Sequence, residues 1–423
     1  VKKWLVRLEN GCYGTPSGAM VKRIHHELGT IGRHKQVRVR PHLLSEASVG
    51  AVFPFQWTRS SSKPRLQGVF KVLKPGVRRH LDEELDILQK TAQFFEAHRD
   101  RYPLKSFNFL DIFQEVRDML IKEVDLAAEQ FHLQEAARFY GGMDGIRIPR
   151  LLPLSTNTMT AMGYLDGFKI TDADLPPQER NKVASDLFEA LICKPLFSPG
   201  EQSLFHGDPH AGNILAMRDS ASGRLEIGLL DWSLAGRLAK RERIKTVQLI
   251  QALLKKDLSR IRRSVKALTI CGSINGTGQR QAFRHLVLDM VGSAGFDRMP
   301  LIKRTFKLME ALSLEGFVFP ADLMLFRKAI FTLEGVLFDL CPDFDMDEAI
   351  THYMGRLMTW EIPARVGYLL FPMADRPENY PSLISNGELQ SLLVHHCLDA
   401  LRANSDAYAR YLSVWRRLLG IPF

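Results

Sequence analysis

The sequence predicts an α+β fold of two lobes: a small strand-rich lobe over residues 1–165 with inserted helices, and a large helical lobe over residues 166–423. Two observations support this prediction. Short runs of β-forming residues, such as the one at 68–73, are concentrated in the first part of the chain and are bounded by turn residues. Later in the chain, apolar residues recur mainly at helical spacing. A connector near 162–167 separates the lobes, and we expect a cleft there.

The individual elements follow from periodicity and turn chemistry. Small residues lead into Val52 and Phe53, which predicts a strand, a turn and a second strand. The next β-forming run ends at Pro75 and Gly76, a strong pair of strand breakers. The expected elements are a helix at 20–28, strands within 43–55 and at 68–73, helices at 81–99 and 107–140, and strands at 147–151, 158–164 and 225–230.

Length and composition are those of an ordinary globular protein. The 423 residues are 45% hydrophobic and 25% charged, which excludes disordered and collagen-like classes. The formal charge of +10 is compatible with an acidic partner, such as phosphate, nucleic acid or an anionic membrane surface, but charge alone favours a basic enzyme that is merely soluble. No uninterrupted apolar stretch reaches the roughly 20 residues of a membrane-spanning helix. The chain starts at Val1 and shows no signal peptide.

The five cysteines are widely scattered and include no C-x-x-C pair. This pattern fits neither a disulfide framework nor a zinc site, and it indicates a reducing compartment. We therefore expect a cytoplasmic protein without a transmembrane segment, associated with a membrane only peripherally, and we expect no nucleic-acid partner.

The strongest chemical signal is the run His206-Gly-Asp-Pro-His-Ala-Gly-Asn213, followed by Leu-Leu-Asp231-Trp after an apolar strand. Phosphoryl transfer from ATP needs a carboxylate near the attacking oxygen and metal ions that neutralise the phosphates. Asp208 is the candidate carboxylate. Asn213 and Asp231 are the candidate metal ligands, because Mg2+ prefers hard oxygen ligands. The spacing is typical of protein kinases, so it predicts a protein-kinase-like fold that uses ATP and Mg2+.

Two other interpretations of the run are open. A turn rich in histidine, aspartate and asparagine between two helical elements would have the same composition without any chemistry. Alternatively, His206 and His210 could bind a metal ion, although no third ligand is evident in the sequence.

A lysine on a strand is the second requirement of such a site, because it holds the α- and β-phosphates of ATP. Lys71 in Val69-Phe-Lys-Val72 is the candidate. Burying an unpaired lysine is costly, so we expect a carboxylate partner, and Glu129 on a helix over 121–134 is the candidate. The alternatives are that Lys71 faces water on an edge strand, or that Lys74 is the phosphate anchor.

Together these motifs resemble the ABC1 family of atypical kinases (also called UbiB or AarF), which is linked to ubiquinone and other prenyl-lipid metabolism. The family's His-x-Asp-Pro-His-Pro-Gly-Asn loop stands at 206–213, and its Val-Lys-Val-Gln-Arg-Pro-Gly strand and turn at 70–76. Its alanine-rich nucleotide loop stands at 45–52 and its Glu-x-Asp helix at 123–125. The resemblance implies Asp208, Lys71 and Glu129 as catalytic residues, and a nucleotide site of Ala47, Ser48, Val49, Gly50, Lys71, Met162 and Tyr164.

The chain departs from the family pattern at several points. The Lys-x-Gly-Gln helix that restrains kinase activity in the family is not found, and residues 1–28 resemble what normally follows it. Ala211 replaces the second proline of the catalytic loop, and Asp231-Trp-Ser233 replaces Asp-Phe-Gly. Glu46 stands in the nucleotide loop where a small residue is usual. Autoinhibition, motion of the metal loop and nucleotide preference are therefore open.

Two alternative functions share parts of the pattern. Aminoglycoside- and choline-type phosphotransferases also carry His-Gly-Asp-x4-Asn-Ile-Leu and Leu-Asp-Trp, and a pseudokinase scaffold would bind nucleotide without turnover. Basic amphipathic helices at 258–266 and 411–419 predict contact with an anionic membrane surface or a prenyl-lipid, unless they simply pack on the core. Apolar stripes after residue 241 are assigned to the core, and neither a phospho-acceptor nor a protein partner can be identified from the sequence.

Overall fold

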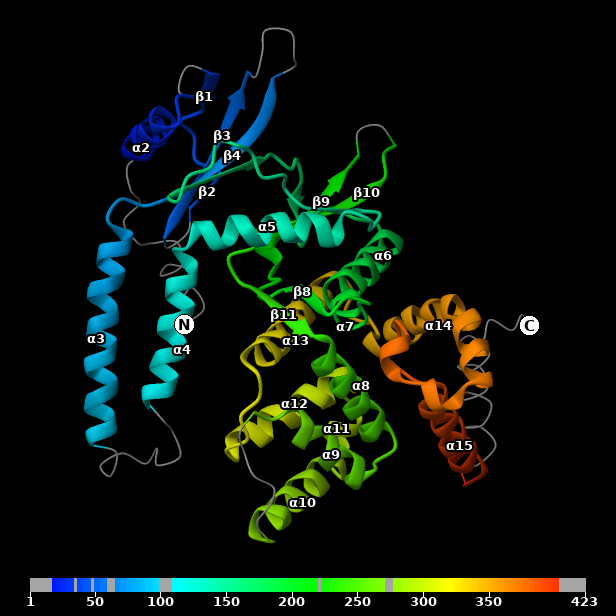
Figure 1. Ribbon diagram of the computed structural model, residues 1–423. Helices are drawn as coiled ribbons and strands as arrows, with labels where there is room; N and C mark the ends of the chain where they lie inside the picture. The colour runs from blue at the N-terminus through cyan, green and yellow to red at the C-terminus, as the bar shows by residue number, and fades with distance from the viewer. Residues whose placement is uncertain are drawn as a thin grey trace. The chain divides into compact units, whose positions relative to one another are not determined.

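The computed structural model of the chain describes residues 17–33, 36–46, 49–58, 65–98, 109–219, 222–270 and 277–402. It confirms the mixed α+β architecture, with a strand-rich N-terminal region and a helical C-terminal region (Figure 1). The chain divides into two compact units, Val1–Phe168 with Leu215–Leu234 and Lys169–Ile214 with Ala235–Phe423. Residues 215–234 thus belong to the first unit, and the lobe boundary expected near residue 165 stays a prediction.

An antiparallel sheet of five strands forms the core of the first unit, in the order β1-β3-β4-β6 with β2 also paired to β3. Phe55 of β3 and Phe70 of β4 are buried and stacked, with ring centroids 3.9 Å apart. Helix α2 (Ser17–Thr30) adds its apolar stripe to the same core. The strands are β1 (Val37–Val39), β2 (Ser45–Glu46), β3 (Gly50–Trp57), β4 (Leu66–Leu73) and β6 (Met159–Gly163).

Three helices follow or interrupt this sheet. Helices α3 (Val77–Ala97) and α4 (Phe109–Glu123) pack against each other (Figure 1). The predicted continuous helical stretch over 107–140 is wrong in one respect, because α4 ends before Asp125 and α5 (Leu126–Tyr140) begins after it. The Asp125 carboxylate accepts a hydrogen bond from the backbone N–H of Ala128 at 3.0 Å. An aspartate that caps the backbone in this way favours the start of a helix over its interior. Helix α5 therefore begins directly after Asp125, which places Glu129 in its first turn.

We expect Asp125→Ala to lower the free energy of unfolding by about 1 kcal/mol, because the variant loses this N-terminal cap. Urea denaturation followed by circular dichroism would measure the change. Asp125→Asn keeps an oxygen that can accept the same hydrogen bond and should be close to wild type. Equal destabilisation by both substitutions would contradict a capping role.

A second sheet has the order β5-β10-β9-β7, formed by β5 (Ile146–Arg147), β10 (Leu225–Leu229), β9 (Ile214–Arg218) and β7 (Phe168–Lys169). Strand β10 pairs with β5 in parallel and is almost completely buried. Arg147 of β5 donates from Nε to the carboxylate of Glu226 on β10 at 2.9 Å. The loop that carries Asp231 therefore leaves from the end of a strand that is fixed on both sides.

The second unit begins its core with β8 (Gln202–His206), antiparallel to β11 (Ala235–Ala239). The fully buried guanidinium of Arg243 donates to the carbonyls of Ser198 and Gly200, which ties α8 to the segment leading into β8. None of the helices in the described ranges is long and apolar enough to span a bilayer. Those of this unit are α6 (Pro177–Phe188), α7 (Lys194–Leu196), α8 (Lys240–Leu254), α9 (Leu258–Leu268), α10 (Thr277–Val291), α11 (Ala294–Asp297), α12 (Leu301–Leu314), α13 (Ala321–Leu340), α14 (Met346–Leu370) and α15 (Asn386–Arg402), with a π-helical turn at Glu189–Cys193 and 3-10 turns at Ala211–Asn213, Pro372–Ala374 and Pro377–Asn379.

Candidate active site

Lys71 lies on β4, in the middle of the first sheet, opposite Val52 of β3 and Thr160 of β6. Its side chain is only 14% exposed, so it is not an edge-strand lysine facing water. Its Nζ lies 2.8 Å from Oε1 of Glu129 and 3.1 Å from Oδ1 of Asp231. The expected carboxylate partner is therefore present, and three of the predicted site residues meet in the first unit.

These three charges control one another's protonation. Burial would lower the pKa of Lys71, but the carboxylates of Glu129 and Asp231 outweigh burial and raise it above its ordinary value. Burial raises the pKa of Glu129 to about 7, against the opposing charge of Lys71. Burial also acts to raise the pKa of Asp231, but Lys71 and hydrogen bonds from Ser233 lower it to about 2. Lys71 thus keeps its positive charge, which is what holding a phosphate requires.

Asp231 occupies an unusual backbone position just after β10. Its φ is 51°, in the left-handed region that residues with a side chain rarely adopt. The backbone N–H of Ser233 donates to Asp231 Oδ1 at 3.2 Å, which holds the carboxylate against its own loop. Backbone strain of this kind is concentrated at functional sites and persists only when the surroundings enforce it.

The surroundings that enforce it come from helix α5. Trp232 is completely buried and lies against Tyr140, with ring centroids 5.8 Å apart. His132 donates from Nδ1 to the carbonyl oxygen of Trp232 at 3.1 Å. Helix α5 therefore supplies the lysine's partner, Glu129, and also anchors the loop that presents Asp231. The tryptophan that replaces the family's phenylalanine is a packing residue in this structure.

The nucleotide loop is described only in part, because Ala47 and Ser48 lie outside the described residues. Val49 is half-buried, and Gly50 begins β3, where a Cβ would lie 3.0 Å from the Val72 carbonyl oxygen. Lys74 pairs with Glu46 at 2.8 Å and donates from its backbone N–H to Val49. Lys74 thus holds the loop and Lys71 pairs with the acids, which favours Lys71 as the phosphate anchor.

The two remaining residues expected to contact nucleotide lie at the end of β6. Met162 pairs with Val69 across the sheet and is buried. Tyr164 follows the strand, and its side chain is 38% exposed. Both lie in the first unit with Lys71, and their contact with nucleotide stays a prediction.

Asp208 and Asn213 lie in the second unit, in a compact turn after β8. Asn213 donates from Nδ2 to the Asp208 carbonyl oxygen at 3.1 Å. The Nδ1 atoms of His206 and His210 accept hydrogen bonds from the backbone N–H groups of Asp208 and Gly212, at 3.1 and 3.0 Å. These histidines therefore shape the turn, and the Asp208 carboxylate is left 35% exposed.

Lys328 is a neighbour of Asp208 that the sequence did not indicate. Its Nζ lies 3.3 Å from Asp208 Oδ1, and it extends from α13. The residues around Lys328 in the sequence are those of any solvent-exposed lysine on an amphipathic helix. Only the tertiary fold could therefore show that it lies beside Asp208.

The sequence indicates Asp231 and Asn213 as magnesium ligands, and this assignment stays a prediction. In the part of the chain that the structure describes, no group of three or more histidine, cysteine, aspartate or glutamate side chains could enclose a metal ion. Magnesium at kinase and ATPase sites is bound by one or two carboxylates together with substrate phosphates. Asp231 in the first unit and Asn213 in the second each carry a hard oxygen of the kind that magnesium prefers.

Comparison with known proteins decides the family. The model of the ABC1 atypical kinase-like domain matches residues 7–265, more than half of the chain. The chain belongs to the ABC1 atypical kinase-like family. This confirms the kinase-like fold predicted from the spacing of the catalytic and metal loops.

Several curated relatives are similar to this ABC1 family member. An uncharacterized protein of Synechocystis is 27% identical over 309 residues, 72% of this chain and 50% of that protein. The chloroplastic protein ACTIVITY OF BC1 COMPLEX KINASE 7 of Arabidopsis thaliana is 24% identical, over 71% of this chain and 42% of that one. A probable protein kinase UbiB of Xanthomonas euvesicatoria is 22% identical, over 72% and 54%. The chain spans about half the length of the curated relatives it matches.

Among solved structures, the complex of Rv3197 with erythromycin from Mycobacterium tuberculosis overlaps this chain with a TM-score of 0.49. The sequence identity is 17%, over 78% of this chain and 80% of that one.

Proposed function

We propose that the chain is an ABC1-type phosphotransferase or ATPase that uses Mg-ATP. The observation that carries this proposal is the largely buried ion pair of Lys71 and Glu129 beside Asp231, whose side chain is 36% exposed and whose backbone is held at a strained position. A lysine ion-paired to a helix glutamate beside a metal-binding aspartate is the arrangement that protein kinases use to hold ATP. Burial of such a cluster is costly for a fold and is explained by a ligand that requires it.

Each residue has a proposed role. Lys71 holds the α- and β-phosphates, and Glu129 keeps the lysine in place and charged. Asp231 and Asn213 provide oxygen ligands for magnesium, which when bound neutralises phosphate charge. Asp208 accepts the proton of the attacking hydroxyl or water. Val49, Gly50, Met162 and Tyr164, together with Ala47 and Ser48, line the nucleotide.

Phosphate release from Mg-ATP tests this function. We expect slow turnover that stops when magnesium is chelated and falls strongly in Asp208→Asn. Turnover that Asp208→Asn leaves unchanged would contradict the proposal. Nucleotide binding without turnover, in the presence of lipid, amino-sugar and choline acceptors, would instead indicate a pseudokinase. Rapid phosphorylation of an amino-sugar or choline would indicate the aminoglycoside- or choline-type alternative.

A role in ubiquinone or prenyl-lipid metabolism at a membrane surface is the finer part of the proposal, and similarity to a protein named UbiB supports it. The described basic helix, α9, limits how such contact could occur. Its apolar residues, among them Ile261 and Val265, are buried, whereas Arg262, Arg263 and Lys266 are exposed. Contact through α9 would therefore be electrostatic rather than insertion of an apolar face. The second basic helix expected from the sequence, at 411–419, lies outside the described residues.

We expect Arg262→Ala with Arg263→Ala to weaken binding to anionic vesicles by about thirtyfold at low salt, because each basic residue near such a surface contributes about 1 kcal/mol. Sedimentation with phosphatidylserine-containing vesicles would measure this. Arg180→Ala with Arg218→Ala removes the same charge elsewhere and serves as the control. Equal binding by both double variants would show that α9 is not the contact surface.

A further inference from the structure

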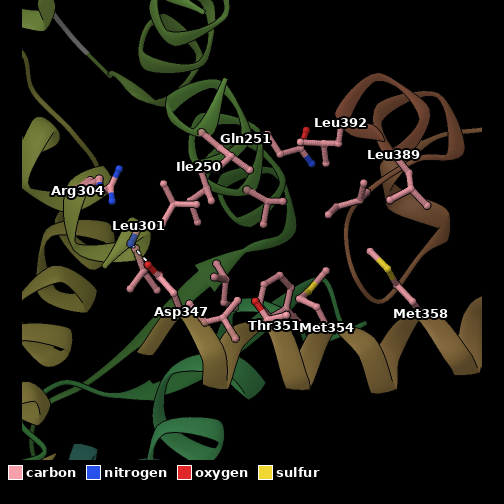
Figure 2. Close-up of a pocket in the computed structure, with 17 residues that line it drawn as sticks. Ile250, Gln251, Leu301, Arg304, Asp347, Thr351, Met354, Met358, Leu389 and Leu392 are labelled. Atoms are coloured by element: carbon pink, nitrogen blue, oxygen red, sulfur yellow. Dashed lines mark hydrogen bonds between the residues drawn. The ribbon is translucent and has the colours of Figure 1, made fainter. Parts of the chain in front are cut away.

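The second unit contains a cavity that the proposed phosphotransfer does not use. Its volume is about 400 Å³, within the range of small-molecule pockets, about 300–1,000 Å³. Helices α8, α12, α14 and α15 surround it, and Figure 2 shows their side chains directed toward a common space. The lining is almost entirely apolar, with residues such as Ile250, Met354, Met358, Leu389 and Leu392.

The charged residues of the lining are already engaged by the protein. Arg304 donates from Nε to the Met299 carbonyl oxygen at 2.6 Å, and its guanidinium also contacts Asp297. Asp347 accepts the backbone N–H of Leu301, the first residue of α12, at 2.8 Å. Both side chains therefore fix the start of α12, and Arg304 is in addition ion-paired with Asp297.

Gln251 differs from these residues. It is 6% exposed, lines the cavity from α8, and its Nε2 has no hydrogen-bond partner among the described residues. Figure 2 shows its amide reaching toward Leu392 of α15. A buried donor without an acceptor destabilises a fold, and most buried polar groups are satisfied. An apolar side chain would fill this position at lower cost, so the amide is best explained by an acceptor that arrives with a ligand.

We propose that this cavity binds a neutral, mostly apolar small molecule whose carbonyl or similar oxygen accepts a hydrogen bond from Gln251 Nε2. Apolar walls provide affinity, and one precisely placed donor provides orientation, which is the usual division in small-molecule sites. A charged ligand is disfavoured because the lining is almost entirely apolar and both of its charged side chains are held by contacts within the protein. The proposal concerns the second unit alone and does not depend on ATP turnover.

Binding of 2-nonanone and nonane, measured by headspace equilibrium partitioning over the full chain, tests this site. Nonane has the same chain length but no acceptor, and nonanoate, measured by dialysis, adds a charge. Gln251→Leu should weaken 2-nonanone binding about fivefold and leave nonane binding unchanged or stronger, since it removes only the donor. It should also raise the melting temperature, because the unpaired amide is gone. Met358→Trp should abolish binding of both neutral probes, whereas Ala364→Trp, on an exposed part of the same helix, should not.

Three results would overturn the proposal. The first is binding of both neutral probes that Met358→Trp does not reduce. The second is an equal effect of Gln251→Leu on 2-nonanone and nonane. The third is tighter binding of nonanoate than of 2-nonanone. Melting curves of each variant show whether it is folded, so a loss of binding without a lowered melting temperature is interpreted as a loss of the site.

Discussion

Replacing Asp231 by asparagine is expected to lower the rate of phosphate release from Mg-ATP by at least about a hundredfold. The amide keeps the shape of the side chain but removes the charge that would bind magnesium, and a metal ion stabilises the transition state by several kcal/mol. A loss of about 3 kcal/mol corresponds to about a hundredfold in rate. The variant also removes one of the two acids that pair with Lys71, whose contact with Glu129 at 2.8 Å remains.

Asp144→Asn is the matched control, because the same chemical change is made in the same unit at a side chain that is 90% exposed. Its turnover should equal that of wild type. Fluorescence titration with nucleotide, with and without magnesium, would show whether Asp231→Asn retains nucleotide but loses its dependence on the metal. Wild-type turnover in Asp231→Asn would remove this residue from the magnesium site.

The sequence predicted site residues well where a whole motif lies on one strand or one loop. Lys71 lies within an apolar β run, and the cost of burying it correctly predicted an acidic partner. The sequence left Lys71 and Lys74 as competing anchors, because both precede the same turn. Only the pairing of Lys74 with Glu46 separates them. The predicted helix also ran past Asp125, because apolar residues keep their helical spacing of 3.6 residues per turn on both sides of this cap. One capping residue between two helices therefore leaves little trace in the periodicity.

Contacts between distant segments were not readable from the sequence. Lys328 beside Asp208 and the anchoring of Trp232 by His132 join residues about 100 or more positions apart. The apolar stripes after residue 241 have the spacing of ordinary core helices, and most of them are core. The stripes of α8, α14 and α15 instead leave a cavity, because where helices separate depends on packing rather than on periodicity. Gln251 is one of the polar residues among the buried positions of α8, and its place at the cavity is visible only in the fold.

Glu361→Ala is expected to lower the free energy of unfolding of the second unit by about 3–5 kcal/mol, the cost of leaving one member of a buried ion pair alone. Glu361 Oε2 lies 2.6 Å from Arg365 Nη2, and the two side chains are 1% and 11% exposed. The same carboxylate accepts from the backbone N–H and hydroxyl of Ser382, at 2.5 and 2.9 Å. Arg365 also donates to Asn386 at 3.0 Å and lies over the ring of Tyr380, 4.3 Å from its centroid.

This network joins α14 to the segment that leads into α15, so its loss should first appear there. Hydrogen exchange over residues 372–395 and urea denaturation of the full chain would measure the local and global effects. Asp186→Ala breaks an exposed pair with Lys182 in the same unit and should cost less than about 1 kcal/mol. Glu361→Met with Arg365→Met removes both charges, so it should be less destabilising than Glu361→Ala alone. A double variant that is as unstable as the sum of its single variants would show that the two charges do not stabilise each other.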